Sequence, residues 1–74
     1  MTKEVHGYRE ELEEILKFTQ GRNWIKTSEI AEFDCGATPD KKLQERNART
    51  VRRRYQIENG GLSVSQFARK RALL

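Results

Sequence analysis

The residues best suited to do chemistry form a basic stretch between Lys41 and Arg54. Within it, four cations follow one another at intervals of four, three and four residues: Lys42, Arg46, Arg49 and Arg53. An α-helix turns about 100° per residue, so this spacing predicts one line of cations along a helix, which we call the basic ridge. Guanidinium groups in a row bind oxyanions, above all phosphates, and they also pair with the acceptor edge of guanine.

Further polar residues flank the basic ridge and complete the predicted contact set, which is Lys41, Lys42, Arg46, Arg49, Thr50, Arg52, Arg53 and Gln56. The opposite side of the same helix carries the residues that we expect to face the protein body, namely Leu43, Asn47, Ala48, Val51 and Tyr55. Arg54 falls at the edge of this apolar side. Its long side chain is expected to lie along the core and to reach the acidic residues of the first helix.

The distribution of charge supports a polyanionic partner. Residues 1–40 hold five basic and nine acidic residues, a net charge of −4, whereas residues 41–74 hold ten basic and two acidic residues, a net charge of +8, so the whole chain carries +4. Such a division creates one positive pole. An acidic protein or an anionic membrane would also be attracted to it, so charge by itself does not identify the partner.

Three elements are expected before the basic stretch. Tyr8, Leu12, Ile15, Leu16 and Thr19 share one face, which predicts a helix over Tyr8–Gln20 that Gly21 ends. A short extended piece should follow at residues 23–26 and pack Trp24 or Ile25 into the core. A second helix is predicted over Ser28–Phe33, capped by Thr27 or Ser28 and ended by a turn at Gly36.

The basic stretch itself is expected to lie on a long third helix. Thr38-Pro39-Asp40 is a typical helix start, and nothing interrupts the helix before Glu58, so Asn59-Gly60-Gly61 should end it. Leu62–Val64 is predicted to form a short strand, and Ser65–Leu74 a last helix, with Ser63 and Gln66 spaced as a capping box. We find no internal repeat along the chain.

Several short motifs resemble winged helix-turn-helix regulators, and most closely the small bacterial regulators of pilus operons. The likeness covers about Ile15 to Tyr55 and includes Ile15-Leu16-Lys17-Phe18, Lys26-Thr27-Ser28-Glu29-Ile30-Ala31-Glu32 and Arg49-Thr50-Val51-Arg52-Arg53. It implies that Thr50 and the arginines face DNA while Val51 enters the core. The tail, Leu62–Leu74, resembles the opening of another helix-turn-helix.

The chain departs from this family in two places. The stretch Ala37–Asn47 is longer than the usual turn, so the recognition helix is either unusually long or broken near Asn47. The stretch Gln56–Val64 is too short for two wing strands. We therefore expect an all-α or nearly all-α fold: a three-helix, winged-helix-like domain with a minimal or absent wing. The predicted parts are a flexible N-terminus at 1–7, the DNA-binding domain at 8–64 and a C-terminal helix or tail at 65–74.

Composition argues against several other classes of protein. A single cysteine, Cys35, permits neither a disulfide within the chain nor a cysteine-based metal site, and we expect it to be partly buried. The only histidine, His6, lies near the chain start, so no catalytic triad can be built around it. We therefore expect no catalytic residues, cofactor, metal or small-molecule ligand. The charged N-terminus and the lack of a long apolar run predict a cytoplasmic protein, associated with the nucleoid if it is bacterial.

Together these features predict a sequence-specific protein that binds double-stranded DNA with the 39–58 helix in the major groove. It would be a small transcriptional regulator or an accessory factor of phage or plasmid excision, replication or packaging. One alternative is RNA binding, since Asn47–Arg54 resembles the arginine-rich peptides of phage antitermination proteins. Another is a protein-interaction module that dimerises or binds an acidic partner. A homodimer is compatible with DNA binding and is left open.

Overall fold

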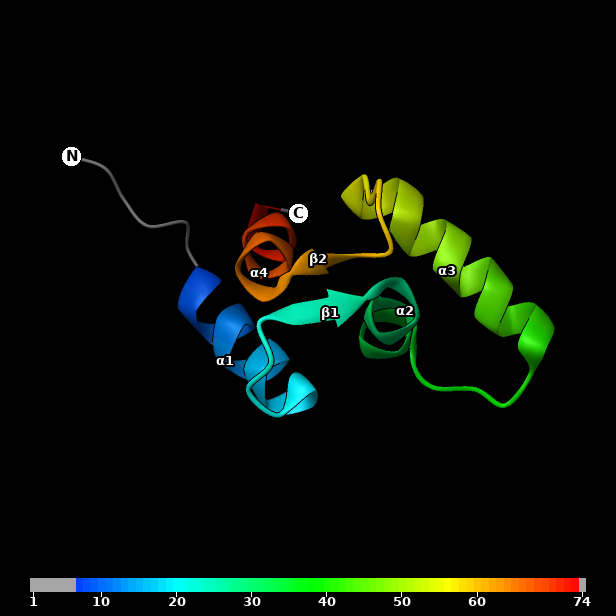
Figure 1. Cartoon of the computed structure of the whole chain (residues 1–74), viewed down its shortest axis with the longest axis horizontal. Coiled ribbons are helices and arrows are strands. Elements are labelled where there is room, and N and C mark those ends of the chain that lie inside the picture. The colour runs from blue at the N-terminus through cyan, green and yellow to red at the C-terminus, as the bar shows by residue number, and fades with distance from the viewer. Residues whose placement is uncertain (1–6, 74) are drawn as a thin grey trace.

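A computed structural model describes residues 7–73 and is mostly helical, with four helices and one small sheet (Figure 1). The helices are α1 (Tyr8–Thr19), α2 (Thr27–Cys35), α3 (Lys41–Tyr55) and α4 (Val64–Leu73), and the strands are β1 (Trp24–Lys26) and β2 (Gly61–Ser63). The expected predominance of helix is confirmed. Within residues 7–73 the fourth helix is the C-terminal one, expected as a helix or tail from Ser65 and observed as a helix from Val64 to Leu73.

The two strands pair antiparallel in the middle of the molecule. Ile25 lies opposite Leu62, and this central pair is flanked by Trp24 opposite Ser63 and by Lys26 opposite Gly61. Two further bonds extend the ladder symmetrically: Thr27 N–H donates to Gly60 O at 2.9 Å and Val64 N–H donates to Asn23 O at 2.8 Å. β2 thus pairs with the strand before α2 instead of forming a hairpin wing.

The described chain consists of two α-β-α halves related by an approximate two-fold axis through the sheet. The axis brings α1 onto α3, β1 onto β2 and α2 onto α4, so that α1 packs against α4 and α2 against α3 (Figure 1). Buried residues correspond as well, since Ile15 and Thr19 of α1 occupy the places of Val51 and Tyr55 of α3. The expectation of no internal repeat was wrong, because burial pattern and backbone geometry repeat while most side chains do not.

The ends of equivalent helices repeat in detail. α1 and α3 both end in a left-handed residue, Gln20 at φ 58° and Gln56 at φ 54°. The next amide in each half, of Gly21 or Ile57, donates to a carbonyl of the last turn. At the following helix starts, Lys26 N–H donates to Glu29 Oε1 at 3.0 Å, and Gln66 N–H donates to Ser63 Oγ at 3.2 Å. The expected contact between Ser63 and Gln66 is therefore present.

Several predicted boundaries need correction. α2 is longer than Ser28–Phe33, and Lys26 is its N-cap rather than Thr27 or Ser28. α3 starts at Lys41 because the Asp40 carboxylate, and not the Thr38 hydroxyl, accepts from the amides of Lys42 and Leu43. It runs unbroken through Asn47 and ends before Gln56, so the glycines at 60 and 61 do not end it.

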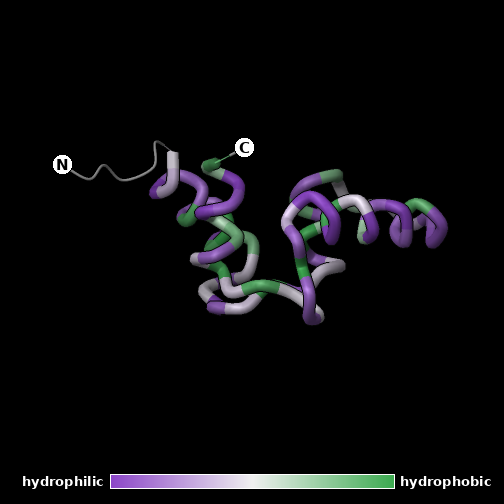
Figure 2. Tube along the Cα trace, turned by 90° about the horizontal axis from the view of Figure 1, so that it is seen from above, coloured by the Kyte–Doolittle hydropathy of each residue, from purple (hydrophilic) through white to green (hydrophobic). Residues whose placement is uncertain are grey.

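The core lies between the two helix pairs and behind the sheet. Its fully buried members come from β1 and all four helices and include Ile15, Ile25, Ile30, Val51, Tyr55 and Phe67, while Leu62 of β2 is nearly buried. Figure 2 shows the hydrophobic positions gathered where the elements meet, while the outer turns of α1 and α3 are hydrophilic. Strand alternation turns Ile25 inward, so Trp24 is 46% exposed and does not belong to the core.

A cluster of charged side chains joins all four helices. Asp34 of α2, whose side chain is only 8% exposed, accepts from Arg54 of α3 at 2.5 Å and from Arg71 of α4. Arg71 also donates to Glu11 of α1 at 2.6 Å and stacks on the ring of Phe33 at 5.0 Å. The carboxylate of Asp34 thus ties the two helix pairs together, and we call this group the Asp34 cluster.

Candidate nucleic-acid interface

Two fully buried side chains fix the orientation of α3. Val51 is 0% and Tyr55 1% exposed, which confirms the predicted inward face of this helix. Tyr55 packs edge-on against Phe67 at 5.1 Å, and Lys70 donates to the Tyr55 carbonyl at 2.7 Å. Burial, followed by the nearby Asp34 carboxylate, raises the pKa of the Tyr55 phenol. Rotation of α3 about its axis would break these contacts, so its outer face is held in place.

The basic ridge lies on the side of α3 that faces away from the core. Arg49 and Arg53 are each two residues from Val51, a rotation of about 200°, which places them opposite the buried face. All four cations of the basic ridge are exposed, and within residues 7–73 none of them pairs with a carboxylate. Their charge is therefore available to an external anion.

The other predicted contact residues surround the basic ridge. Thr50, Arg52, Gln56 and Lys41 are all exposed. The Thr50 hydroxyl donates to Arg46 O at 3.0 Å, which leaves its oxygen free to accept a bond from a ligand. α3 therefore carries the whole predicted set, from its first residue to its C-cap.

Two residues of α3 lie differently from the prediction. Leu43 was expected to face the body but is 39% exposed, because the first turn of α3 extends beyond α2. Arg54 was expected to reach the acidic residues of α1 but bonds Asp34 of α2 instead. The arginine that reaches α1 is Arg71, on the helix that the sequence left least defined.

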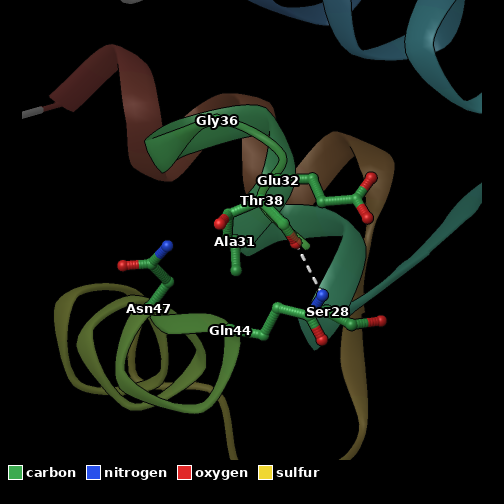
Figure 3. A pocket seen from close by; sticks show the side chains of 7 residues that line it. All are labelled: Ser28, Ala31, Glu32, Gly36, Thr38, Gln44 and Asn47. Carbon is green, nitrogen blue, oxygen red and sulfur yellow. Dashed lines mark hydrogen bonds between the residues drawn. The ribbon is translucent and has the colours of Figure 1, made fainter. Parts of the chain in front are cut away.

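A small pocket between α2 and α3 shows how the linker contacts α3 (Figure 3). Gln44 of α3 donates to the Thr38 carbonyl at 2.6 Å, and Asn47 lies on the same side beside Ala31. These contacts anchor residues 36–40 to the first turns of α3. The pocket measures about 80 Å³, far below the size at which drug-sized ligands bind, so its evident role is structural.

The equivalent face of α1 carries the opposite charge. Counted from the matching pairs Ile15 with Val51 and Thr19 with Tyr55, the residues at the positions of Arg46 and Arg49 are Glu10 and Glu13. Both glutamates are exposed. The position of Arg53 corresponds to Lys17, so the outer face of α1 carries two glutamates and a lysine where the basic ridge carries three arginines.

Features of other classes of site are few in the described residues. Within 7–73 no group of three or more histidine, cysteine or acidic side chains is placed to hold a metal ion. Cys35 is exposed rather than partly buried, because it ends α2 beside the open linker. His6 and most of the predicted flexible N-terminus lie outside the described residues. No helix of residues 7–73 combines the length and apolarity that crossing a membrane requires.

Comparisons with protein-family models, curated proteins and solved structures find no match to this chain. The likeness to pilus-operon regulators therefore stays a prediction from short motifs. The account of the site rests on its geometry and charge.

Proposed function

We propose that the protein binds double-stranded DNA by placing α3 in the major groove. The observation that carries this proposal is the basic ridge, four exposed cations in line on a helix whose opposite face is anchored by Val51 and Tyr55. An α-helix fits the major groove, where arginine can contact phosphates and guanine edges. With its fifteen residues, α3 is about 22 Å long, enough to follow the groove for several base pairs.

The arrangement of α2 and α3 fits this function. In helix-turn-helix proteins the second helix lies in the groove while the first crosses the backbone. Here α2 packs against α3 and the linker 36–40 joins them, which supports the use of this pair as a helix-turn-helix, while α1 packs mainly against α4. The biological role that follows is that of a small regulator of transcription or an accessory DNA-binding factor.

The packing of α3 favours DNA over the RNA alternative. Arginine-rich peptides that fold on an RNA hairpin are disordered when free. The corresponding segment, Asn47–Arg54, is helical and buries Val51 completely against the rest of the chain. A preformed helix with one exposed basic face suits a groove of fixed shape.

Fluorescence anisotropy with a random-sequence duplex tests the proposal. We expect binding at low salt in the micromolar range, with affinity that falls steeply as salt rises, because neutralised phosphates release counterions. Arg49→Ala should weaken binding about threefold to tenfold and leave thermal unfolding unchanged. Failure to bind duplex at low salt would reject the function, and normal binding by the variant would remove Arg49 from the interface.

A further inference from the structure

The exposed Trp24 lies in a hollow whose other walls come from the second half of the chain. This hollow, which we call the Trp24 hollow, holds about 350 Å³. Its other walls are formed by Gln56, Glu58, Asn59, Gly61, Leu62, Gln66 and Lys70, which include three side-chain amides, one carboxylate and one ammonium group. The sheet brings these parts together, because Trp24 of β1 pairs with Ser63, three residues before Gln66.

Protein packing does not account for the exposure of this indole. Ile25 supplies the buried side chain of β1, while almost half of the Trp24 surface meets solvent. At the equivalent place in the other half stands Gly61, where a Cβ would come within 2.2 Å of the Ile25 carbonyl oxygen. The fold thus requires a small residue on β2 and leaves a large aromatic one free on β1.

The two halves also differ in the residues around this position. In the first half, Arg22 and Glu29 form an ion pair at 2.7 Å, so their charges neutralise each other. The counterpart of Glu29 is the neutral Gln66, and Glu58 and Asn59 take the place of Arg22, because the second half has one more residue in this turn. Within the described part of the chain, no hydrogen bond engages the side-chain amides of Gln56 and Asn59, and Gln66 bonds only through its oxygen and its backbone. Unpaired amide donors and acceptors therefore surround the indole.

We propose that the Trp24 hollow binds an unpaired nucleobase, stacked on the indole and hydrogen-bonded by the surrounding amides. Glutamine and asparagine side chains carry a donor and an acceptor side by side, which complements the edge of a base. Aromatic side chains stack on bases of any sequence, and Lys70 supplies a cation for the adjoining phosphate. This inference rests on the proposed nucleic-acid function and adds a site for single-stranded or unpaired segments to the duplex contact of α3.

The backbone around Trp24 is rigid, which favours such a site. The carbonyl of Asn23 accepts from Val64 N–H at 2.8 Å, and Ile25 pairs with Leu62 in the sheet. The backbone that carries the indole is thereby held on both sides of Trp24. A preorganised platform loses little conformational entropy on binding.

The fluorescence of the protein reports on this site directly, because Trp24 is the only tryptophan of the chain. The full chain would be titrated with a short oligothymidylate and with an abasic strand of equal length. We expect oligothymidylate to quench the emission and the abasic strand, which offers the same phosphates without bases, to leave it unchanged. Trp24→Ala should lower affinity for labelled oligothymidylate about tenfold, Trp24→Phe should largely restore it, and duplex affinity should stay the same in both variants.

The results of these titrations distinguish a failure of the nucleobase site from a failure of duplex binding by α3. Equal emission changes with the two strands, or full oligothymidylate affinity in Trp24→Ala, would overturn the nucleobase site even if duplex binding is strong. Base-dependent quenching without duplex binding would support the Trp24 hollow and reject the role of α3. Quenching by an acidic peptide but by no oligonucleotide would overturn the inference and assign the hollow to a protein partner.

Discussion

The two helix pairs of this protein share one architecture but differ in charge. α3 and α1 occupy equivalent places and bury equivalent residues, Val51 and Tyr55 in one, Ile15 and Thr19 in the other. On the outer face, Arg46 and Arg49 of α3 stand where α1 has Glu10 and Glu13. The same packing therefore occurs in both halves, whereas the exposed residues distinguish the two ends.

This asymmetry bears on how many nucleic acids one molecule binds. A symmetric molecule with two basic faces would bridge two duplexes, but an acidic face repels phosphate. On our account one molecule therefore offers a single duplex-binding end. The acidic helices of the first half also suit the basic helices of the second, since α1 packs against α4 and α2 against α3.

The largest effect, on duplex affinity, is expected when α3 carries glutamate at the two positions where α1 has Glu10 and Glu13. The double variant Arg46→Glu and Arg49→Glu removes two cations from the basic ridge and adds two repulsive charges. Duplex affinity at low salt should fall on the order of 100-fold, measured by anisotropy. Thermal unfolding should change little, because both residues are exposed; retained binding would show that α3 does not contact DNA.

The next largest effect, on the free energy of unfolding, is expected at the Asp34 cluster, which joins the two helix pairs. Asp34→Asn leaves Arg71 and Arg54 without their shared anion and should cost about 2 kcal/mol in urea unfolding, less than for a fully buried pair since Arg54 is 44% exposed. The control is Glu32→Gln, an equal charge change at an exposed site of α2. An equal response of both variants would mean that the Asp34 cluster contributes nothing specific.

A smaller effect follows from a buried hydroxyl that breaks the symmetry. Thr27 is 6% exposed, its Oγ1 has no hydrogen-bond partner within the described residues, and its counterpart in the other half is Val64. Thr27→Val should stabilise the protein by up to about 1 kcal/mol, and the reverse change Val64→Thr should destabilise it by about 1–2 kcal/mol. Destabilisation by Thr27→Val would contradict the equivalence of these two positions.

The smallest expected effect is a pH dependence confined to the first half. The hydrogen bond from Arg22, followed by that from the Lys26 amide, lowers the pKa of Glu29 in the folded state. The stability that it contributes is therefore present above the pKa of the unfolded chain and is lost as the pH falls through the folded value. Thermal unfolding should show the wild type losing its advantage over Glu29→Gln in acid. A constant difference between the two proteins would contradict this role of the Arg22 bond.

The sequence predicted the parts of the fold that depend on local pattern. Helical spacing identified α1 and the inward face of α3, because Val51 and Tyr55 are apolar residues among cations. It missed the repeat, since the matching signal is short: Ser28-Glu29-Ile30-Ala31 against Ser65-Gln66-Phe67-Ala68. Repeated burial at these positions, rather than repeated residue types, was the signal that could have revealed it.

Contacts between residues far apart in the sequence could not be predicted from the spacing of residue types. The helical wheel placed Arg54 at the edge of the core, but only the packing of α2 against α3 selects Asp34 as its partner. Either Trp24 or Ile25 was expected in the core, and the register of β1 in the sheet selects Ile25, since alternation allows only one of the two to face inward. The predicted contact set of α3 proved exposed, while its binding to DNA stays a prediction.

One matched pair of variants tests the central claim most directly. Arg53 of the basic ridge and Lys17 of α1 occupy equivalent exposed positions, so Arg53→Gln and Lys17→Gln remove one positive charge each from opposite ends. Duplex affinity would be measured for both across a salt series. We predict that Arg53→Gln weakens binding and lowers the salt slope by about 1, while Lys17→Gln changes neither. Equal losses in the two variants would show that net charge, and not the face of α3, holds the DNA.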